Sequence, residues 1–152
     1  NEQFTAETIP AQRLIPNLPV DAKERLKVLV VEDNKTNMKL VVNLLEIGGY
    51  NPIQAFSAGE GIRSSEIYKP ALIVMDISLP DMDGLAATRV IKSNPLTSHI
   101  PVIALTAGTM KIDEETAKES GCDAYFVKPF DIWIFYRTIV GLIKTVDEGQ
   151  VE

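Results

Sequence analysis

Five polar side chains stand where short apolar runs of the sequence end, at positions that would be strand tips. Glu32 and Asp33 follow the first run, Asp76 the third, Thr106 the fourth and Lys128 the fifth. Because open α/β sheets bind ligands at the carboxyl ends of their strands, these groups are predicted to converge on one crevice. Each alone is a common turn or capping residue, so the informative observation is their joint occurrence in strand order.

The chemistry of such a cluster follows from its residue types. Three crowded carboxylates, from Glu32, Asp33 and Asp76, repel one another and therefore need a cation. A few carboxylate oxygens with open positions for water suit Mg²⁺. Lys128 offers a compact positive charge and Thr106 a hydroxyl donor, and both can neutralise a phosphoryl group during transfer. The residues thus predict that Asp76 attacks phosphorus and becomes phosphorylated.

The elements that must position these groups alternate along the chain. Five apolar runs have the length of strands, and most are rich in Val and Ile, which predicts strands buried on both faces. The runs are Val28–Val31, Ile53–Phe56, Leu72–Met75, Val102–Leu105 and Ala124–Val127.

The stretches between the runs carry helical spacing and capping signals, and residues 110–120 are predicted to form a more polar helix. The predicted N-caps are Ser57, Asp83 and Asp131, and the predicted helix stops are Gly48, Gly49 and Gly121.

This (βα)₅ pattern predicts an α/β fold with a doubly wound parallel sheet of five strands, since crossovers between parallel strands are right-handed. One domain is expected over residues 27–146. Residues 1–26 hold three prolines and no steady apolar period, which predicts an N-terminal linker or arm. Residues 147–152 are expected to be an acidic C-terminal tail.

Composition narrows the function classes. With 15 basic and 21 acidic residues the formal charge is −6, and no stripe of Lys and Arg is present, so nucleic acid is not an expected partner. No apolar run approaches the roughly 20 residues that span a bilayer, and no membrane association is expected. The single cysteine, Cys122, excludes an intrachain disulfide and suits a reducing compartment, so a cytoplasmic location is expected.

Four stretches of the chain resemble the receiver domain of two-component response regulators, a CheY-like family. They are VLVVEDNKTNMKLV, LIVMDISLPDMDGL, IPVIALTAG and GCDAYFVKPF, and the resemblance covers residues 27–146. In style the chain is similar to DivK-type stand-alone receivers and to the receivers of hybrid histidine kinases. The resemblance implies a flavodoxin-like fold with strand order 2-1-3-4-5.

The resemblance also assigns roles around the metal. It implies that Asp76 is the phosphoacceptor, that Asp33 binds Mg²⁺ directly and that Glu32 acts through water. Ser78 would offer its backbone carbonyl to the metal.

The remaining roles concern the phosphoryl group and the switch. Thr106 matches the hydroxyl that moves to the phosphoryl group, Tyr125 the aromatic rotamer switch, and Lys128 the lysine that binds phosphoryl oxygen. The peptide bond between Lys128 and Pro129 is expected to be cis. Ser78 and Gly108 offer no carboxylate or carboxamide to orient water, so slow autodephosphorylation is predicted.

These roles imply a phosphorelay switch rather than an enzyme. The phosphoryl donor would be a sensor histidine kinase or a histidine phosphotransfer protein, and a downstream protein would bind the face made by the fourth helix, fifth strand and fifth helix. The expected state is a monomer or a phosphorylation-dependent homodimer. The chain would be a stand-alone protein or a domain excised from a hybrid kinase or larger regulator.

Three alternatives stay open. The first is an interaction module whose site is preserved but unused. The second is a flavodoxin-like cofactor binder, although Glu32 and Asp33 would repel an anion where a phosphate loop is needed. The third is a hydrolase with an Asp nucleophile, although Ser78 stands where that class needs an acid/base carboxylate.

A few further residues have structural interpretations. Cys122 is expected to be small and buried. Asp81 and Asp83 faintly resemble part of a calcium loop but are better interpreted as a turn and a helix cap. On the last helix, spacing places Phe135 inside and leaves Trp133 or Tyr136 as candidates for contact with a partner.

Overall fold

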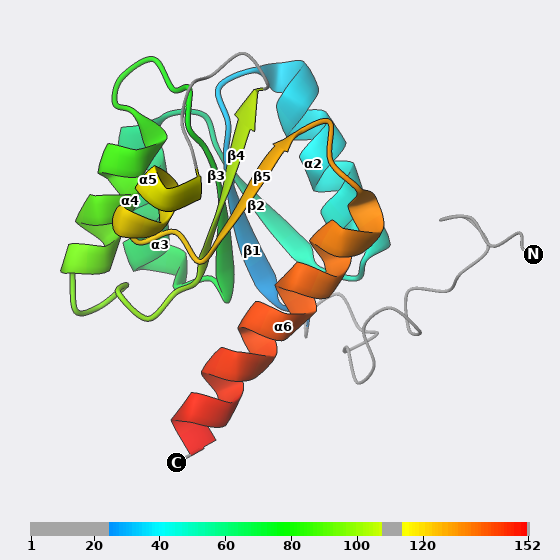
Figure 1. The fold of residues 1–152 in the computed structure, drawn as a ribbon, viewed down its shortest axis with the longest axis vertical. Helices are drawn as coiled ribbons and strands as arrows, with labels where there is room; N and C mark the ends of the chain where they lie inside the picture. The colour runs from blue at the N-terminus through cyan, green and yellow to red at the C-terminus, as the bar shows by residue number, and fades with distance from the viewer. Residues whose placement is uncertain (1–24, 108–113, 152) are drawn as a thin grey trace, which may run out of the picture.

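A computed structural model describes residues 25–107 and 114–151, which form a five-stranded parallel sheet with helices on both faces (Figure 1). The strands lie in the order β2-β1-β3-β4-β5, and every neighbouring pair is parallel. The predicted fold class and strand order are confirmed. The strands are β1 (Lys27–Val31), β2 (Asn51–Ala55), β3 (Leu72–Asp76), β4 (Val102–Ala107) and β5 (Ala124–Lys128).

Five helices connect and extend these strands in the described part of the chain. They are α2 (Lys35–Ile47), α3 (Ala58–Tyr68), α4 (Gly84–Ser93), α5 (Glu114–Glu119) and α6 (Ile132–Val151).

Side chains cap most of these helices where the sequence predicts. The oxygens of Ser57 and Asp83 accept backbone N–H groups at the starts of α3 and α4, and Asp131 does so for α6. Asn34 caps α2 in the same way, which was not predicted. Each cap satisfies donors that have no partner inside the helix, and thereby fixes where the chain turns from strand to helix.

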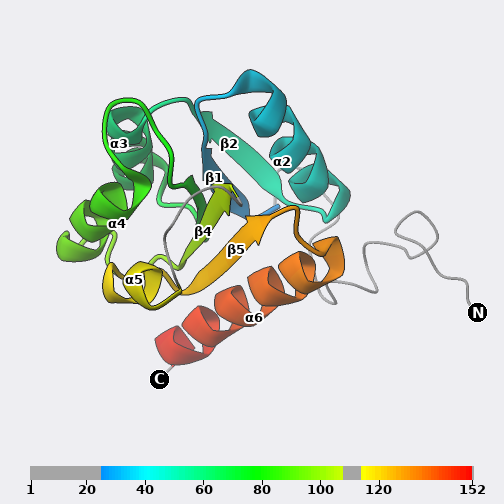
Figure 2. The ribbon, with the colours of Figure 1, turned by 45° about the horizontal axis from the view of Figure 1, so that its top comes forward.

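Helices cover both faces of the sheet (Figure 2), and the core forms one layer beneath the helices on each face. Because side chains alternate along a strand, Val30 and Val74 pack toward α2 and α6, whereas Leu29 and Ile73 pack toward α3, α4 and α5. β1 and β3 are buried on both faces over most of their length, as predicted. Their tips therefore have little freedom to move.

The edge strands differ from this prediction. β2 and β5 are only partly buried, because each has a single neighbouring strand and incomplete helix cover. Pro52 lies in β2, where an edge position tolerates the missing N–H. Phe56 was included in the second run, but it follows the strand and is exposed.

Both ends of the chain bear on the predicted domain limits. α6 continues through Val151, so helix extends into residues 147–152, which the sequence analysis set apart as a tail. Most of the predicted arm, residues 1–24, lies outside the described residues, as do residues 110–113 of the helix predicted over 110–120. None of the helices in the described ranges is long and apolar enough to cross a bilayer.

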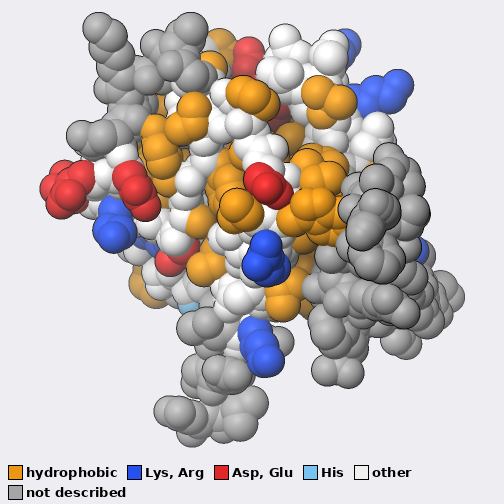
Figure 3. All heavy atoms as spheres, turned by 45° about the vertical axis from the view of Figure 1, so that its right-hand side comes forward, with side chains coloured by type: hydrophobic (Ala, Val, Ile, Leu, Met, Phe, Trp, Pro, Cys, Tyr) orange, Lys and Arg blue, Asp and Glu red, His pale blue; other side chains and the backbone are white. Residues whose placement is uncertain are grey.

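Hydrophobic side chains reach the surface where α2 and the start of α6 lie (Figure 3). Leu40 and Ile47 are exposed and lie seven positions apart, on one face of α2, while Ile134 is exposed on α6. α2 is therefore apolar around more of its circumference than core packing alone requires.

Tyr136 joins these two helices and corrects one prediction. It is 2% exposed, and its hydroxyl donates a hydrogen bond of 2.7 Å to the carbonyl oxygen of Leu44. Gly48 leaves room for the ring, since a Cβ there would lie 3.0 Å from the Cε1 atom of Tyr136. Tyr136 is thus a core residue, and of the two predicted candidates for partner contact only Trp133, which is half-buried, keeps an accessible side chain.

Candidate functional site

Sheet register brings the predicted site residues to one edge. Val31 pairs with Met75, so the residues that follow them, Glu32 and Asp76, end their strands at the same level. Thr106 pairs with Val127 one step further along, next to Lys128. The register therefore places all of these residues at the carboxyl edge of the sheet.

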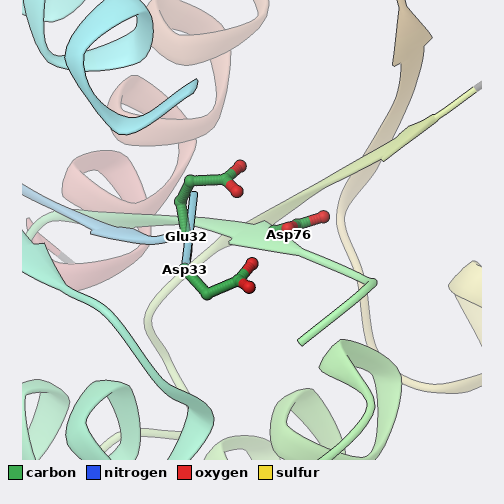
Figure 4. A group of neighbouring side chains, drawn as sticks. All are labelled: Glu32, Asp33 and Asp76. Carbon is green, nitrogen blue, oxygen red and sulfur yellow. The ribbon is translucent and has the colours of Figure 1, made fainter. Parts of the chain in front are cut away.

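The three carboxylates form a compact cluster at the tips of β1 and β3 (Figure 4). One carboxylate oxygen from each of Glu32, Asp33 and Asp76 lies within 4.8 Å of the other two. Glu32 is 2% exposed and Asp76 6% exposed, whereas Asp33 is open to solvent. A cluster with one solvent-facing member leaves a path by which an ion could enter.

The electrostatics of the cluster favour a cation. Burial, and then repulsion by Glu32, raises the pKa of Asp76 to about 7. The backbone N–H of Ser78, 3.1 Å from Asp76 Oδ1, and the charge of Lys128 act in the opposite direction but do not offset this. A carboxylate this reluctant to ionise gains free energy from an added positive charge.

Lys128 provides one positive charge at the rim. Its Nζ atom lies 3.4 Å from Glu32 Oε1, and the other oxygen of Glu32 accepts the backbone N–H of Asn34 at 3.2 Å. The peptide bond that joins Lys128 to Pro129 is cis, as predicted.

Thr106 lies near the end of β4, and Tyr125 lies on β5. Thr106 is 1% exposed, and its hydroxyl donates to the carbonyl oxygen of Ala107 at 3.3 Å. Tyr125 is half-buried and lines a small hollow of about 30 Å³ between α5 and β5. Cys122 also lines the hollow and is buried as predicted.

The loop after β3 makes two close contacts, one with the end of its own strand and one with the start of α3. A Cβ on Gly84 would collide with the carbonyl oxygen of Asp76, so only glycine lets α4 begin this close to the strand tip. Asp81 accepts the backbone N–H groups of Ala58 and Gly59, each at 2.9 Å, at the start of α3. Asp81 was predicted to be a turn residue only, because its partners lie 22 and 23 positions away in the sequence and no local pattern indicates them.

The donor set fits Mg²⁺. Hard oxygen ligands, three carboxylates in reach of one point and an unfavourable charge balance are what a small divalent cation requires. Of the described side chains, Glu32, Asp33 and Asp76 are the ones that could hold it. The described residues offer no other such group of acidic or metal-ligating side chains.

Comparison with known proteins points to one family. The family model of the response regulator receiver domain matches residues 28–136. The polar-differentiation response regulator DivK of Brucella ovis is 45% identical over 112 residues, covering 74% of this chain and 91% of DivK. DivK of Brucella anthropi is 44% identical over the same length and the same shares.

Solved structures agree. The receiver domain of a sensor histidine kinase from Pseudomonas aeruginosa PAO1, with a magnesium ion coordinated in its active site cleft, superposes with a TM-score of 0.73 at 32% identity, covering 79% of this chain and 98% of that one. The receiver domain of a signal transduction histidine kinase from Syntrophus aciditrophicus gives 0.73 at 30% identity, covering 80% and 92%. The chain therefore belongs to the response regulator receiver domain family, the phosphoacceptor signalling domains of two-component systems.

Proposed function

We propose that Asp76 is the phosphoacceptor of this receiver domain and that Mg²⁺ held at the carboxylate cluster assists its phosphorylation. The observation that carries the proposal is the approach of the Glu32, Asp33 and Asp76 oxygens to within 4.8 Å of one another. In the sheet, β3 lies between β1, which precedes the acidic pair, and β4 and β5, which carry Thr106 and Lys128. Asp76, at the end of β3, therefore stands between these two groups.

The metal would be held directly by Asp33 and Asp76 and by the backbone carbonyl of Ser78, with Glu32 acting through water. When bound, Mg²⁺ supplies positive charge that favours ionised Asp76 and offsets the charge of the incoming phosphoryl oxygens. Because the pKa of Asp76 is about 7 without metal, this effect bears directly on how much nucleophilic carboxylate is present at neutral pH.

The phosphoryl donor is a phosphohistidine on a sensor histidine kinase or a histidine phosphotransfer protein. A carboxylate oxygen of Asp76 forms a bond to phosphorus as the phosphorus–nitrogen bond breaks, and the electron pair returns to the imidazole of the partner. Lys128 shifts its ammonium from Glu32 toward a phosphoryl oxygen, and Thr106 donates its hydroxyl to another. This exchange is proposed to take place in the cytoplasm.

Phosphorylation then biases a pre-existing equilibrium. Thr106 leaves its contact with Ala107, and Tyr125 turns into the space that opens. The face formed by α5, β5 and α6, which correspond to the fourth helix, fifth strand and fifth helix of the prediction, changes its affinity for a downstream protein. To matter, the coupling must be about 1–3 kcal/mol. The domain acts as a monomer or as a homodimer formed on phosphorylation.

Slow autodephosphorylation is part of the same proposal. The side chain of Ser78 cannot orient an attacking water as a carboxylate or carboxamide would. Gly108, the other residue on which the prediction rests, lies outside the described residues. The expected lifetime of the phosphoryl group on the protein is minutes or longer. Its loss from purified phosphoprotein within seconds would contradict slow autodephosphorylation but not the assignment of Asp76.

Acetyl phosphate provides the direct test. The wild-type protein should gain one phosphoryl group in the presence of Mg²⁺ and none with a chelator, as seen by intact mass. Peptide mapping should place the group on Asp76, and Asp76→Asn should not be labelled while its circular dichroism stays native. Labelling of Asp76→Asn at the wild-type rate would refute the assignment, and absence of labelling in the wild type would favour an interaction module.

A further inference from the structure

Asp81 makes a two-pronged contact between two loops. Its Oδ1 accepts the N–H of Ala58 and its Oδ2 the N–H of Gly59, both at 2.9 Å. Asp81 lies in the β3–α4 loop, five residues after Asp76, whereas its partners begin α3. These hydrogen bonds from Gly59 and Ala58 lower the pKa of Asp81, so the carboxylate is ionised whenever the protein is near neutral pH.

This contact completes the start of α3. Ser57 accepts the N–H of Glu60 at 3.1 Å, and the N–H of Gly61 enters the helix ladder through the Ser57 carbonyl. The two donors left before them, Ala58 and Gly59, are those taken by Asp81. A residue from another loop thus supplies two of the partners that a helix start needs.

The first turn of α3 is seated on β1. A Cβ on Gly61 would lie 2.7 Å from Cγ2 of Val31, so the helix packs against that strand without room to spare. Val31 is the residue before Glu32 and Asp33. The N–H of Glu32 also bonds to the carbonyl of Ala55 at 3.0 Å, just before α3. The start of α3 is therefore closely packed against the strand that ends at the acidic pair.

The other end of the contact lies on the loop that carries Asp76 and Ser78. That loop is tied back on itself, since the N–H groups of Leu79 and Gly84 both reach the carbonyl of Ile77, at 3.2 and 2.8 Å. Between Leu79 and Gly84 the loop stands away from the sheet, with Pro80 and Asp81 both exposed. Asp81 links this outer part of the loop to the start of α3.

We propose that Asp81 is a positioning residue that braces the metal site, because it ties the loop carrying Asp76 and Ser78 to the helix seated on the strand that carries Glu32 and Asp33. The inference rests on the proposed function, since it assumes that these residues hold Mg²⁺. Asp81 does not touch the ion; it fixes the separation of the two groups of ligands before the ion arrives.

Loss of the Asp81 contact should therefore lower the affinity for Mg²⁺ and leave the rate of phosphorylation at saturating Mg²⁺ unchanged. An ion that must first draw two loosened tips together binds more weakly, since ordering the ligands subtracts from the binding free energy. Once Mg²⁺ is saturating, the ligands are held by the ion itself. The maximal rate of phosphorylation should then be close to that of the wild type.

The experiment compares Asp81→Ala and Asp81→Asn with Ser57→Ala. Ser57→Ala removes a cap from the same helix start but leaves the loop contact in place. The Mg²⁺ dissociation constant is measured by titration calorimetry in about 0.5 M KCl, where a Debye length of roughly 4 Å screens the exposed charge of Asp81. Amide hydrogen exchange at Ala58 and Gly59 reports the contact itself without metal.

For Asp81→Ala we expect a dissociation constant about five- to tenfold higher and faster exchange at both amides, with a smaller effect for Asp81→Asn, whose one oxygen keeps a single acceptor. Ser57→Ala should stay within about twofold of the wild type. Equal affinities for Asp81→Ala and Ser57→Ala would overturn the brace. Wild-type protein that binds no Mg²⁺ would instead overturn the proposed function, so the two failures are distinguishable.

Discussion

Lys128 Nζ lies 3.4 Å from Glu32 Oε1, an ion pair that joins residues 96 positions apart. β5 and β1 carry these residues, and β4 and β3 lie between them in the sheet. The lysine side chain therefore reaches across the crevice in which Asp76 ends β3. Its ammonium pairs with Glu32, and under the proposed function the same ammonium would bind a phosphoryl oxygen.

Lys128→Met should lower the free energy of unfolding of the metal-free protein by about 1–2 kcal/mol, because Glu32 is left buried without its ammonium partner. Urea denaturation at pH 7.5 with a chelator measures this. In a Glu32→Gln background the same change should cost clearly less, since no buried charge is left behind. Equal costs in both backgrounds would show that the pair is not coupled.

Asp76→Asn should stabilise the metal-free protein above neutral pH. The pKa of Asp76 is raised in the folded state from 3.8 to about 7, so between these values the unfolded chain has released a proton that the native state retains. The contribution of Asp76 to the free energy of unfolding therefore falls as pH rises from 4 to 7. Asn cannot ionise and does not lose this contribution. The advantage should be on the order of 4 kcal/mol at pH 8.

The same comparison at pH 4 provides the control. At pH 4 Asp76 is protonated in the native state and about half ionised in the unfolded chain, so the advantage of Asp76→Asn should shrink to about 0.5 kcal/mol. Saturating Mg²⁺ at pH 8 should also reverse it, because the ion stabilises only the carboxylate form. Parallel pH profiles for the two proteins between pH 4 and 8 would contradict the raised pKa.

Magnesium affinity should fall with acidity for the same reason. Below pH 7 a proton competes with the ion for Asp76, so the apparent dissociation constant should rise by up to about tenfold per pH unit. Denaturation midpoints at fixed Mg²⁺ report this through ligand linkage, which is worth about 2.7 kcal/mol at a hundredfold excess over the dissociation constant. A flat profile between pH 5.5 and 7 would mean that Asp76 is not a ligand.

Much of this site was predictable from the sequence because its residues share a local signature. Asp76 and Thr106 each end a buried apolar run, and the parallel fold brings all such ends to one edge. The caps at Ser57, Asp83 and Asp131 were predictable in the same way, since a cap is read within three or four residues.

Apart from the Asn34 cap, the contacts that were not predicted join distant segments. Asp81 reaches α3 only after the chain has folded, and nothing in the sequence around Asp81 marks its partners. Tyr136 looked like a surface residue because Phe135 beside it filled the core position. It is buried because Gly48, which was read only as a helix stop, vacates space on a neighbouring helix.

Tyr136→Phe should lower the free energy of unfolding by about 1 kcal/mol, the typical loss for a neutral hydrogen bond whose carbonyl acceptor, here Leu44, loses its donor. Phosphorylation by acetyl phosphate should be unchanged, since the contact lies between α2 and α6 and not at the sheet edge. Tyr68→Phe, at an exposed tyrosine, is the matched control and should change stability by less than about 0.5 kcal/mol. Equal losses of stability in Tyr136→Phe and Tyr68→Phe would argue against a stabilising hydrogen bond between Tyr136 and Leu44.

Two glycine variants should act in opposite directions. Gly84→Ala sets a methyl group against the carbonyl oxygen of Asp76 and within 2.7 Å of the Cα of Ile77, which are backbone atoms that cannot step aside. The backbone must shift, so we expect the free energy of unfolding to fall by roughly 2–4 kcal/mol and Asp76 to be labelled more slowly even in folded protein.

Gly141→Ala, inside α6 with no atom within 4 Å of the new Cβ, should raise the free energy of unfolding by about 0.5–1 kcal/mol. Denaturation and acetyl phosphate labelling on both variants separate the effects: labelling should be normal in Gly141→Ala. Normal labelling in Gly84→Ala would mean that the strand tip tolerates displacement, contrary to the close packing of α4 against Asp76.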